Sequence, residues 1–483
     1  MATAMETEGG GDQAELIPDY MNLHSTLPTQ AGVIKKVIRN VPPVHSIEST
    51  GPISFQIPSG ANELIYPSGI RIRLQLQIRD SDGDIIDPIA VDAHGARTVK
   101  DIAKVFPVNG FAHAIFSDIE VWLNDTKIAS YDSKYAYKAD LECRLFSTAG
   151  NKKHSLKMCG FSSEQNPYEQ EITSDATLVA KTGAGKENEA DIHKQGTVPK
   201  TSKIWNRRLY KCRGSKTMHY EDRLYSEIFS QSKCLPPGSK LSVKLERSRP
   251  EFCLLNFHDL QYSIYFEKCY LSVPIIKGNS DFIRDMEHKT YSGENMRFPL
   301  RRMVCNSYLF GGFARNFTID NIIGGTVTPR RIFVGFIDAS ALAGNYKMDP
   351  FNYQHCNMQE IKCLLGGQMG SVPEIKCDYT TMDGELDALV ALLRTLGSED
   401  SAEEVGIDLD NFRTRNNIYA FDITGLSGVE LANAFTREEK LPTGLDIHFT
   451  APLPGAISVV VFKEFDSEIV VNGAGEVAFL PYA

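Results

Sequence analysis

Apolar and polar residues alternate along several short stretches of this chain, and turn-forming sequences separate these stretches. The clearest stretch is residues 70–78 (IRIRLQLQI), and residues 53–57 (ISFQI) and 240–245 (KLSVKL) follow the same pattern. Side chains that alternate with period two predict β-strands with one packed face and one solvated face. Frequent glycine and proline turns between such strands favour an antiparallel sandwich or jelly roll over a parallel α/β sheet.

The order of these patterns occurs twice. Residues 235–274 combine a Pro-Pro-Gly turn, an alternating stretch, a second turn and an apolar stretch, which together predict a β-hairpin, and residues 441–471 repeat this order. Upstream of each predicted hairpin lie a predicted strand, a turn and a predicted helix. They occupy residues 119–128 with a helix at 135–146, and then residues 361–367 with a helix at 386–396. The chain is therefore predicted to contain two similar all-β domains, each with one short inserted helix.

The length of 483 residues exceeds what one hydrophobic core usually supports. We expect residues 1–45 to form a flexible N-terminal arm, within which residues 34–39 (IKKVIR) form an early strand or lie against a neighbouring molecule. Residues 46–276 are predicted as the first jelly roll and residues 277–483 as the second. Residues 149–203 form a long polar loop in the first domain, and a loop of that length is either functional or mobile.

Composition narrows the class of protein. A hydrophobic content of 42% with 23% charged residues is typical of globular proteins, and the net charge of −10 disfavours a general nucleic-acid-binding surface. Basic residues at 205–213 and 297–302 are better explained by strands with one solvated face, so no specific nucleic-acid site is predicted. The N-terminus lacks the layout of a secretion signal, which predicts an intracellular product, and the ten scattered cysteines are expected to be reduced thiols.

No stretch of the sequence matches a complete motif for calcium binding, phosphate binding or catalysis. Asp80–Asp84 (DSDGD) resembles the start of a calcium loop, but Ile85 and Val91 occupy the positions that need glycine and glutamate, so a turn is predicted. Gly183–Lys186 lacks the spacing and the Ser or Thr of a phosphate-binding loop. The histidines show no metal-binding spacing, and no catalytic motif occurs. The sequence therefore predicts no cofactor, no metal site and no enzyme, with a carboxylate pair outside any motif as the alternative.

Residues 349–355 (DPFNYQH) resemble the PFN-[FY]-x-H segment of the major capsid proteins of Polinton (Maverick) elements and the related adintovirus-like animal viruses. Residues 135–139 (YAYKA) resemble the tyrosine-rich start of the helix in the first domain of that family. Residues 333–344 are similar to its central strand and loop, and residues 418–422 (IYAFD) to its late strand. The resemblance spans about residues 50–475, and neither the N-terminal arm nor the 149–203 loop matches the family.

This resemblance implies a double jelly roll, which is two eight-stranded antiparallel sandwiches side by side. It further implies a structural protein whose pseudo-hexameric homotrimers tile an icosahedral shell. The implied partners are other copies of the chain, neighbouring capsomers and a minor capsid or penton protein. The implied location is the virion, after assembly in the nucleus or cytoplasm of a host cell; an internal membrane is left open.

Six aromatic residues are candidates for the interface between subunits, with core packing as the alternative for each: Phe111, Tyr135, Tyr137, Tyr346, Phe351 and Tyr353. The rival function is a non-viral jelly-roll protein that binds a carbohydrate or another ligand. Asp80–Asp84 would be its candidate calcium cluster.

Overall fold

The computed structural model describes most of the chain. The described residues are 30, 32–48, 51–91, 97–162, 208–209, 211–256, 260–322, 327–366, 372–381, 383–399, 405–423 and 441–481, with a short strand pair, β1 (Thr3–Ala4) and β2 (Leu16–Ile17). Most of the predicted loop at 149–203, including Gly183–Lys186, lies outside the described residues. So does most of the region preceding residue 32.

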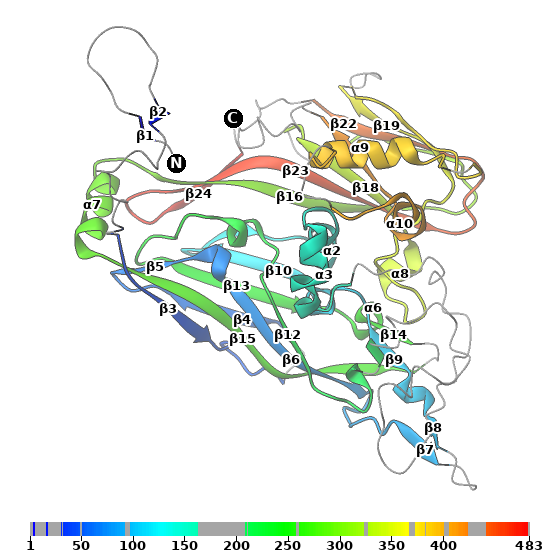
Figure 1. The fold of residues 1–483 in the computed structure, drawn as a ribbon, viewed down its shortest axis with the longest axis horizontal. Helices are drawn as coiled ribbons and strands as arrows, with labels where there is room; N and C mark the ends of the chain where they lie inside the picture. Colours follow the sequence, from blue (N-terminus) through cyan, green and yellow to red (C-terminus); the bar gives the residue numbers. More distant parts are fainter. Residues whose placement is uncertain are drawn as a thin grey trace.

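Two antiparallel sheets formed by strands between residues 33 and 278 build the first sandwich (Figure 1). One sheet has the order β11-β10-β13-β4, and the other has the order β12-β6-β15-β3 with β5 added beside β15. The predicted alternation is clear in β6, where Ile72, Leu74 and Leu76 are buried. The bounds are β3 (Val33–Val41), β4 (Ile53–Pro58), β5 (Glu63–Ile65), β6 (Arg71–Asp80), β10 (Phe116–Leu123), β11 (Thr126–Ala129), β12 (Met218–Asp222), β13 (Lys240–Arg247) and β15 (Tyr262–Gly278).

The second sandwich is built in the same way from strands between residues 296 and 481. One sheet has the order β17-β22-β19-β20, and the other has the order β16-β23-β18-β21 with β24 added beside β23. The bounds are β16 (Met296–Phe310), β17 (Asn316–Ile319), β18 (Arg331–Asp338), β19 (Met358–Leu365), β20 (Ile375–Lys376), β21 (Ile418–Asp422), β22 (Thr443–Phe449), β23 (Ile457–Val471) and β24 (Val477–Pro481).

The two sandwiches have the same topology. If β3, β4, β6, β10, β11, β12, β13 and β15 are matched in chain order to β16 through β23, the two pairs of sheets have identical strand orders. Each sheet contributes four matched strands, so each sandwich has eight, plus the added β5 or β24. The predicted fold class, a double jelly roll in which one fold occurs twice, is confirmed.

The predicted hairpins are wrong, although their strands exist. β13 pairs with β10 and β4, whereas β15 pairs with β6, β5 and β3 in the opposite sheet. β22 and β23 are divided between opposite sheets in the same way. In the first sandwich the chain crosses between sheets through α6 (Pro250–Cys253) and β14 (Leu254–Asn256), which pairs with β9 (Val105–Pro107). Period-two alternation identifies the buried face of a strand, but it does not identify its hydrogen-bonding partner.

Both predicted helices are present at corresponding places. α2 (Tyr135–Leu145) lies between β11 and β12 in the chain, and α9 (Leu386–Leu396) lies between β20 and β21. A third helix of 12 residues, α7 (Ser280–Tyr291), lies between β15 and β16 in the chain. The other helical segments and the small β7–β8 ladder are short: α1 (Phe111–Ala114), α3 (Ala149–Lys153), α8 (Ala339–Ala343), α10 (Leu409–Arg415), η2 (Pro67–Gly69), η3 (Asp101–Ala103), η4 (Ser155–Cys159), η5 (Glu227–Ser230), β7 (Ile89–Val91) and β8 (Arg97–Val99). Among the described residues, no helix is long and apolar enough to span a membrane.

The predicted flexible arm, residues 1–45, extends too far along the sequence, because it includes a strand of the first sandwich. β3, at residues 33–41, pairs in antiparallel register with β15, so it is a strand of the first sandwich. It is an outer strand whose burial pattern is almost entirely exposed. The alternatives for residues 34–39 were a strand or a segment lying against a neighbour, and the structure shows the strand.

A buried polar seam as the candidate functional site

Helix α2 lies between the two sandwiches, against β10 of the first and β16 of the second (Figure 1). Ten of its eleven residues are buried. A helix buried on all sides is usually apolar, because unpaired charges are costly away from water. The sequence of α2 nevertheless includes the buried Lys138, Asp140 and Arg144. The candidate functional site is therefore centred on this helix.

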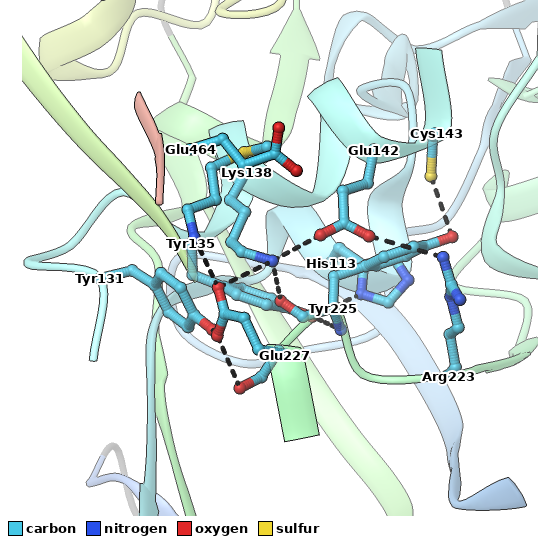
Figure 2. Close-up of polar contacts among 12 residues, drawn as sticks. His113, Tyr131, Tyr135, Lys138, Glu142, Cys143, Arg223, Tyr225, Glu227 and Glu464 are labelled. Atoms are coloured by element: carbon cyan, nitrogen blue, oxygen red, sulfur yellow. Dashed lines mark hydrogen bonds and ion pairs between the residues drawn. The ribbon is translucent and has the colours of Figure 1, made fainter. Parts of the chain in front are cut away.

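The Lys138 ammonium group lies in a pocket of acceptors (Figure 2). Its Nζ donates to Glu142 Oε1 at 2.5 Å and to the Tyr225 carbonyl at 3.0 Å, and lies 3.6 Å from Glu227 Oε1. Burial lowers the pKa of Lys138, but Glu142 and Glu227 outweigh burial and raise this pKa above its ordinary value. Glu227 Oε1 also accepts a hydrogen bond from the Met303 backbone N–H of β16 at 3.0 Å. The Lys138 cluster thus extends from α2 into the second sandwich.

Arg144 makes the most direct connection across the seam. Its Nε donates to Asp140 Oδ2 at 2.6 Å within α2. Its other two nitrogens donate to residues of the second sandwich, Nη1 to Asn416 Oδ1 and Nη2 to the Phe351 carbonyl at 3.0 Å. Burial alone would lower the pKa of Arg144, but the charge of Asp140 raises it above its ordinary value. The planar guanidinium therefore fixes three acceptors in direction as well as in distance.

Lys152 of α3 adds a third cation at the seam. Its side chain is buried, and Nζ donates both to the Arg144 carbonyl and to the Val405 carbonyl of the second half, the latter at 2.5 Å. Burial, together with the positive charge of Arg144, lowers the pKa of Lys152 to about 8.

Aromatic rings surround these charges. Tyr137 of α2, Phe252 of α6 and Phe351 of the second half form a trio of edge-to-face contacts with centroids 5.5–5.7 Å apart. The Arg144 guanidinium lies 5.3 Å from the ring centroid of Tyr353. Edge-to-face aromatic pairs contribute about 0.5–1.5 kcal/mol each beyond the area that they bury. Three of the six predicted interface aromatics, Tyr137, Phe351 and Tyr353, are therefore brought together at the seam.

The structure corrects the role expected for the interface candidates. Phe111, Tyr135, Tyr137, Phe351 and Tyr353 are between 0% and 2% exposed within a single chain, so their side chains offer no surface to another copy. The sixth, Tyr346, is half-buried, and its hydroxyl accepts from the backbone N–H of Tyr262 at 3.2 Å. Core packing, the stated alternative, is what the structure shows for the other five.

The sequence did not identify the charged residues of the seam as a site. Lys138 with Glu142 and Asp140 with Arg144 are each spaced i,i+4. This spacing is typical of ion pairs on a solvated helix face. The available signal was the neighbouring Tyr135, Tyr137 and Leu141, which leave little room for a solvated face on so short a helix.

A cleft of about 530 Å³ opens along the seam beside these residues. On the side of the cleft formed by the second sandwich, Arg331 of β18 forms a two-pronged ion pair with Glu464, its cross-strand neighbour on β23. Both sandwiches line it: Glu142, Phe146, Glu227, Ser230, Gln231, Ser232, Lys233, Pro299, Leu300, Arg301, Met303, Arg331 and Glu464.

The predicted turn at Asp80–Asp84 is confirmed. Asp80 Oδ1 accepts from the backbone N–H groups of Asp82 at 3.1 Å and Asp84 at 2.7 Å, so this carboxylate stabilises its own turn. His355, the last residue of the segment 349–355, stacks on Tyr379 with ring centroids 4.2 Å apart.

No protein-family model matches the chain. The uncharacterized protein F54H12.2 of Caenorhabditis elegans is 22% identical over 430 residues, which cover 87% of this chain and 91% of that protein.

Solved structures match nearly the whole chain. A chain of the Sputnik virophage cryo-EM structure has a TM-score of 0.56 at 10% identity, covering 98% of this chain and 94% of that one. PBCV-1 VP54, fitted into a reconstruction of Sputnik, has a TM-score of 0.53 at 9% identity, covering 95% and 99%. A chain of the PBCV-1 virus capsid has a TM-score of 0.52 at 8% identity with the same coverage. The fold is therefore similar to that of viral double jelly-roll capsid proteins.

Replacing Arg144 by methionine is expected to lower the free energy of unfolding by about 3–5 kcal/mol, because Asp140 is then buried without its cation. Urea denaturation of the purified protein measures this change. The double variant Arg144→Met/Asp140→Leu removes both charges and should recover more than half of the loss. Equal losses in the single and double variants would show that the charges are not coupled.

The contribution of Lys152 to stability is expected to rise with pH. Its pKa is about 8 in the folded chain, against 10.5 ordinarily, so between these values the unfolded state binds more protons at this residue. The free energy of unfolding of the wild type should therefore rise relative to Lys152→Met by about 1–3 kcal/mol over that interval. The exposed Lys153→Met is the matched control. Parallel pH profiles for the wild type and Lys152→Met would contradict this assignment.

Proposed function

We propose that the chain is a major capsid protein, a structural protein and not an enzyme. The observation that carries this proposal is the pairing of two sandwiches with identical strand order, joined through a buried polar seam. The likeness in fold to the PBCV-1 virus capsid supports the same role. A building block of a shell requires a fixed orientation between its two sandwiches. Relative motion between them would change the geometry of every contact with neighbouring building blocks.

Three such chains would provide six sandwiches, and we propose that they form a homotrimer with a pseudo-hexagonal outline. A head-to-tail interface closes into a ring when the rotation between copies is three-fold. Such obligate interfaces usually bury more than about 2,000 Å² in total. These trimers would tile an icosahedral shell, with a minor capsid or penton protein at its vertices. Assembly would take place inside the host cell, and the mature location would be the virion.

We further propose that the chain belongs to the Polinton-type capsid proteins. The segment that carries this resemblance, residues 349–355, lies at the seam. Asp349 pairs with Arg415 and accepts from the Phe351 backbone N–H at 2.9 Å, while the Phe351 carbonyl accepts from Arg144. The segment therefore has a structural task in joining the sandwiches. A relative of similar length in an animal, Caenorhabditis elegans, is consistent with a genetic element carried in animal genomes.

Exposed apolar side chains, rather than the buried aromatics, are the candidates for contact between copies. Ile34 and Ile38 of the outer strand β3 are 71% and 65% exposed. An outer strand offers unpaired backbone groups, and exposed isoleucines on it favour pairing with another chain. We propose that this edge of the first sandwich contacts a second copy of the chain.

The purified protein is expected to have the mass of a trimer at micromolar concentration, as measured by sedimentation velocity or mass photometry. Negative-stain images should show ring-shaped particles with a hexagonal outline. A monomer at that concentration would refute the proposed assembly, whereas the fold, tested separately by circular dichroism, would stand.

The double variant Ile34→Lys/Ile38→Lys is expected to weaken association between copies by about tenfold or more, because each change buries an unpaired charge in the contact. Concentration-dependent light scattering measures the change in association. Ile85→Lys is the matched control, because Ile85 is 67% exposed in the turn that follows β6. Association as strong as that of the wild type would exclude the β3 edge from the contact.

A further inference from the structure

A cluster of metal-ligating side chains lies on the first-sandwich side of α2. His113 of α1, Cys159 of η4 and Asp222 of β12 each place a ligand atom within 4.8 Å of the other two. Within the group, His113 Nε2 and Asp222 Oδ2 are 3.1 Å apart. His113 and Cys159 are 2% and 0% exposed, while the Asp222 side chain is 16% exposed and leaves a route to solvent.

A second thiol joins this cluster. The thiol of Cys143 on α2 lies beside the cluster and is linked to Asp222 through the Tyr225 hydroxyl. Its Sγ donates to the Tyr225 hydroxyl at 3.2 Å, and that hydroxyl donates to Asp222 Oδ2 at 3.3 Å. Figure 2 shows Cys143 extending from its helix toward Tyr225, with His113 nearby. A group of three ligands from three elements therefore has a second thiol, from a fourth element, one hydroxyl away.

We propose that His113, Cys143, Cys159 and Asp222 form a binding site for a single zinc ion. Thiolate, imidazole and carboxylate are the protein ligands of zinc, and its structural sites are tetrahedral. Bonds of about 2.0–2.3 Å place the ligand atoms of such a site about 3.3–3.8 Å apart. His113 Nε2 and Asp222 Oδ2 are 3.1 Å apart and all three ligand atoms of the group lie within 4.8 Å of one another, so shifts of about 1 Å bring these three to the required separations. Cys143 would complete the tetrahedron by turning its thiol away from Tyr225.

The surroundings of His113 suit this role. Its Nδ1 lies 2.9 Å from the Tyr135 hydroxyl, which fixes the orientation of the ring and leaves Nε2 directed toward Asp222. A hydrogen-bonding partner on the second ring nitrogen is typical of metal-bound histidines. Softer thiolate ligands combined with imidazole favour zinc over magnesium or calcium, which prefer oxygen ligands.

The site would connect four elements of the first half that are separated in the sequence. Cys159 ends η4, and Cys143 belongs to the helix that carries Arg144. Zinc would therefore anchor η4 to α1, α2 and β12. Because the ligands converge only in the folded chain, binding would add directly to the free energy of unfolding.

The test uses the full chain, expressed with added zinc, exchanged into metal-free buffer and analysed by inductively coupled plasma mass spectrometry. We expect one zinc per chain in the wild type and none in Cys143→Ser/Cys159→Ser. The control Cys212→Ser/Cys253→Ser, which alters two buried thiols outside the cluster, should keep its zinc. Cobalt(II) substitution should give a thiolate-to-cobalt charge-transfer band in the wild type and the control alone.

A second variant guards against loss of folding in the double cysteine variant. Asp222→Asn preserves the shape of a side chain that is 16% exposed and should weaken zinc binding at least tenfold, with an unchanged circular dichroism spectrum. A natively folded wild type without zinc would overturn the proposal. Zinc retained equally by Cys143→Ser/Cys159→Ser, which is the result expected of an adventitious surface ion, would also overturn it.

Discussion

The arrangement of the two sandwiches depends on the buried guanidinium of Arg144. It contacts Asp140 in its own helix and two acceptors in the other sandwich, and it is 2% exposed. A buried cation that loses a partner costs several kcal/mol, so small shifts between the sandwiches are penalised. An apolar seam of the same size would tolerate sliding, because hydrophobic contact is non-directional. The directional hydrogen bonds of Arg144 therefore hold the two similar domains in one defined relative orientation.

The sequence predicted local structure well, because local structure depends on local chemistry. The Asn124-Asp125 turn has φ angles of 47° and 66°, the left-handed conformation that asparagine and aspartate tolerate in tight hairpins. Helices α2 and α9 were predicted within one residue of their ends. The partner of each strand was not predictable in the same way, since β13 and β15 carry good strand patterns whichever sheet they join.

The functional candidates were harder to predict, because they depend on contacts between distant parts of the chain. The aromatic residues around the PFN segment were recognised, but their burial could not be deduced from composition or spacing. The ion pairs of α2 resemble surface pairs in sequence, and it is the second sandwich that removes them from water. The cluster of His113, Cys159 and Asp222 has no motif spacing at all, because it draws single residues from α1, η4 and β12.

The repeated topology does not make the two halves equivalent, and the helices show the reason. α9 packs against β20 and β21 of its own half and buries apolar side chains such as Leu389 and Leu392. α2 occupies the same place in the chain order of the first half, yet it buries charged groups against the second half. The helix at this place in the chain therefore packs on a sheet in the second sandwich, whereas in the first it connects the two domains. In the proposed trimer, six sandwiches of one topology would therefore present two alternating kinds of surface, and contacts between trimers would have to suit both.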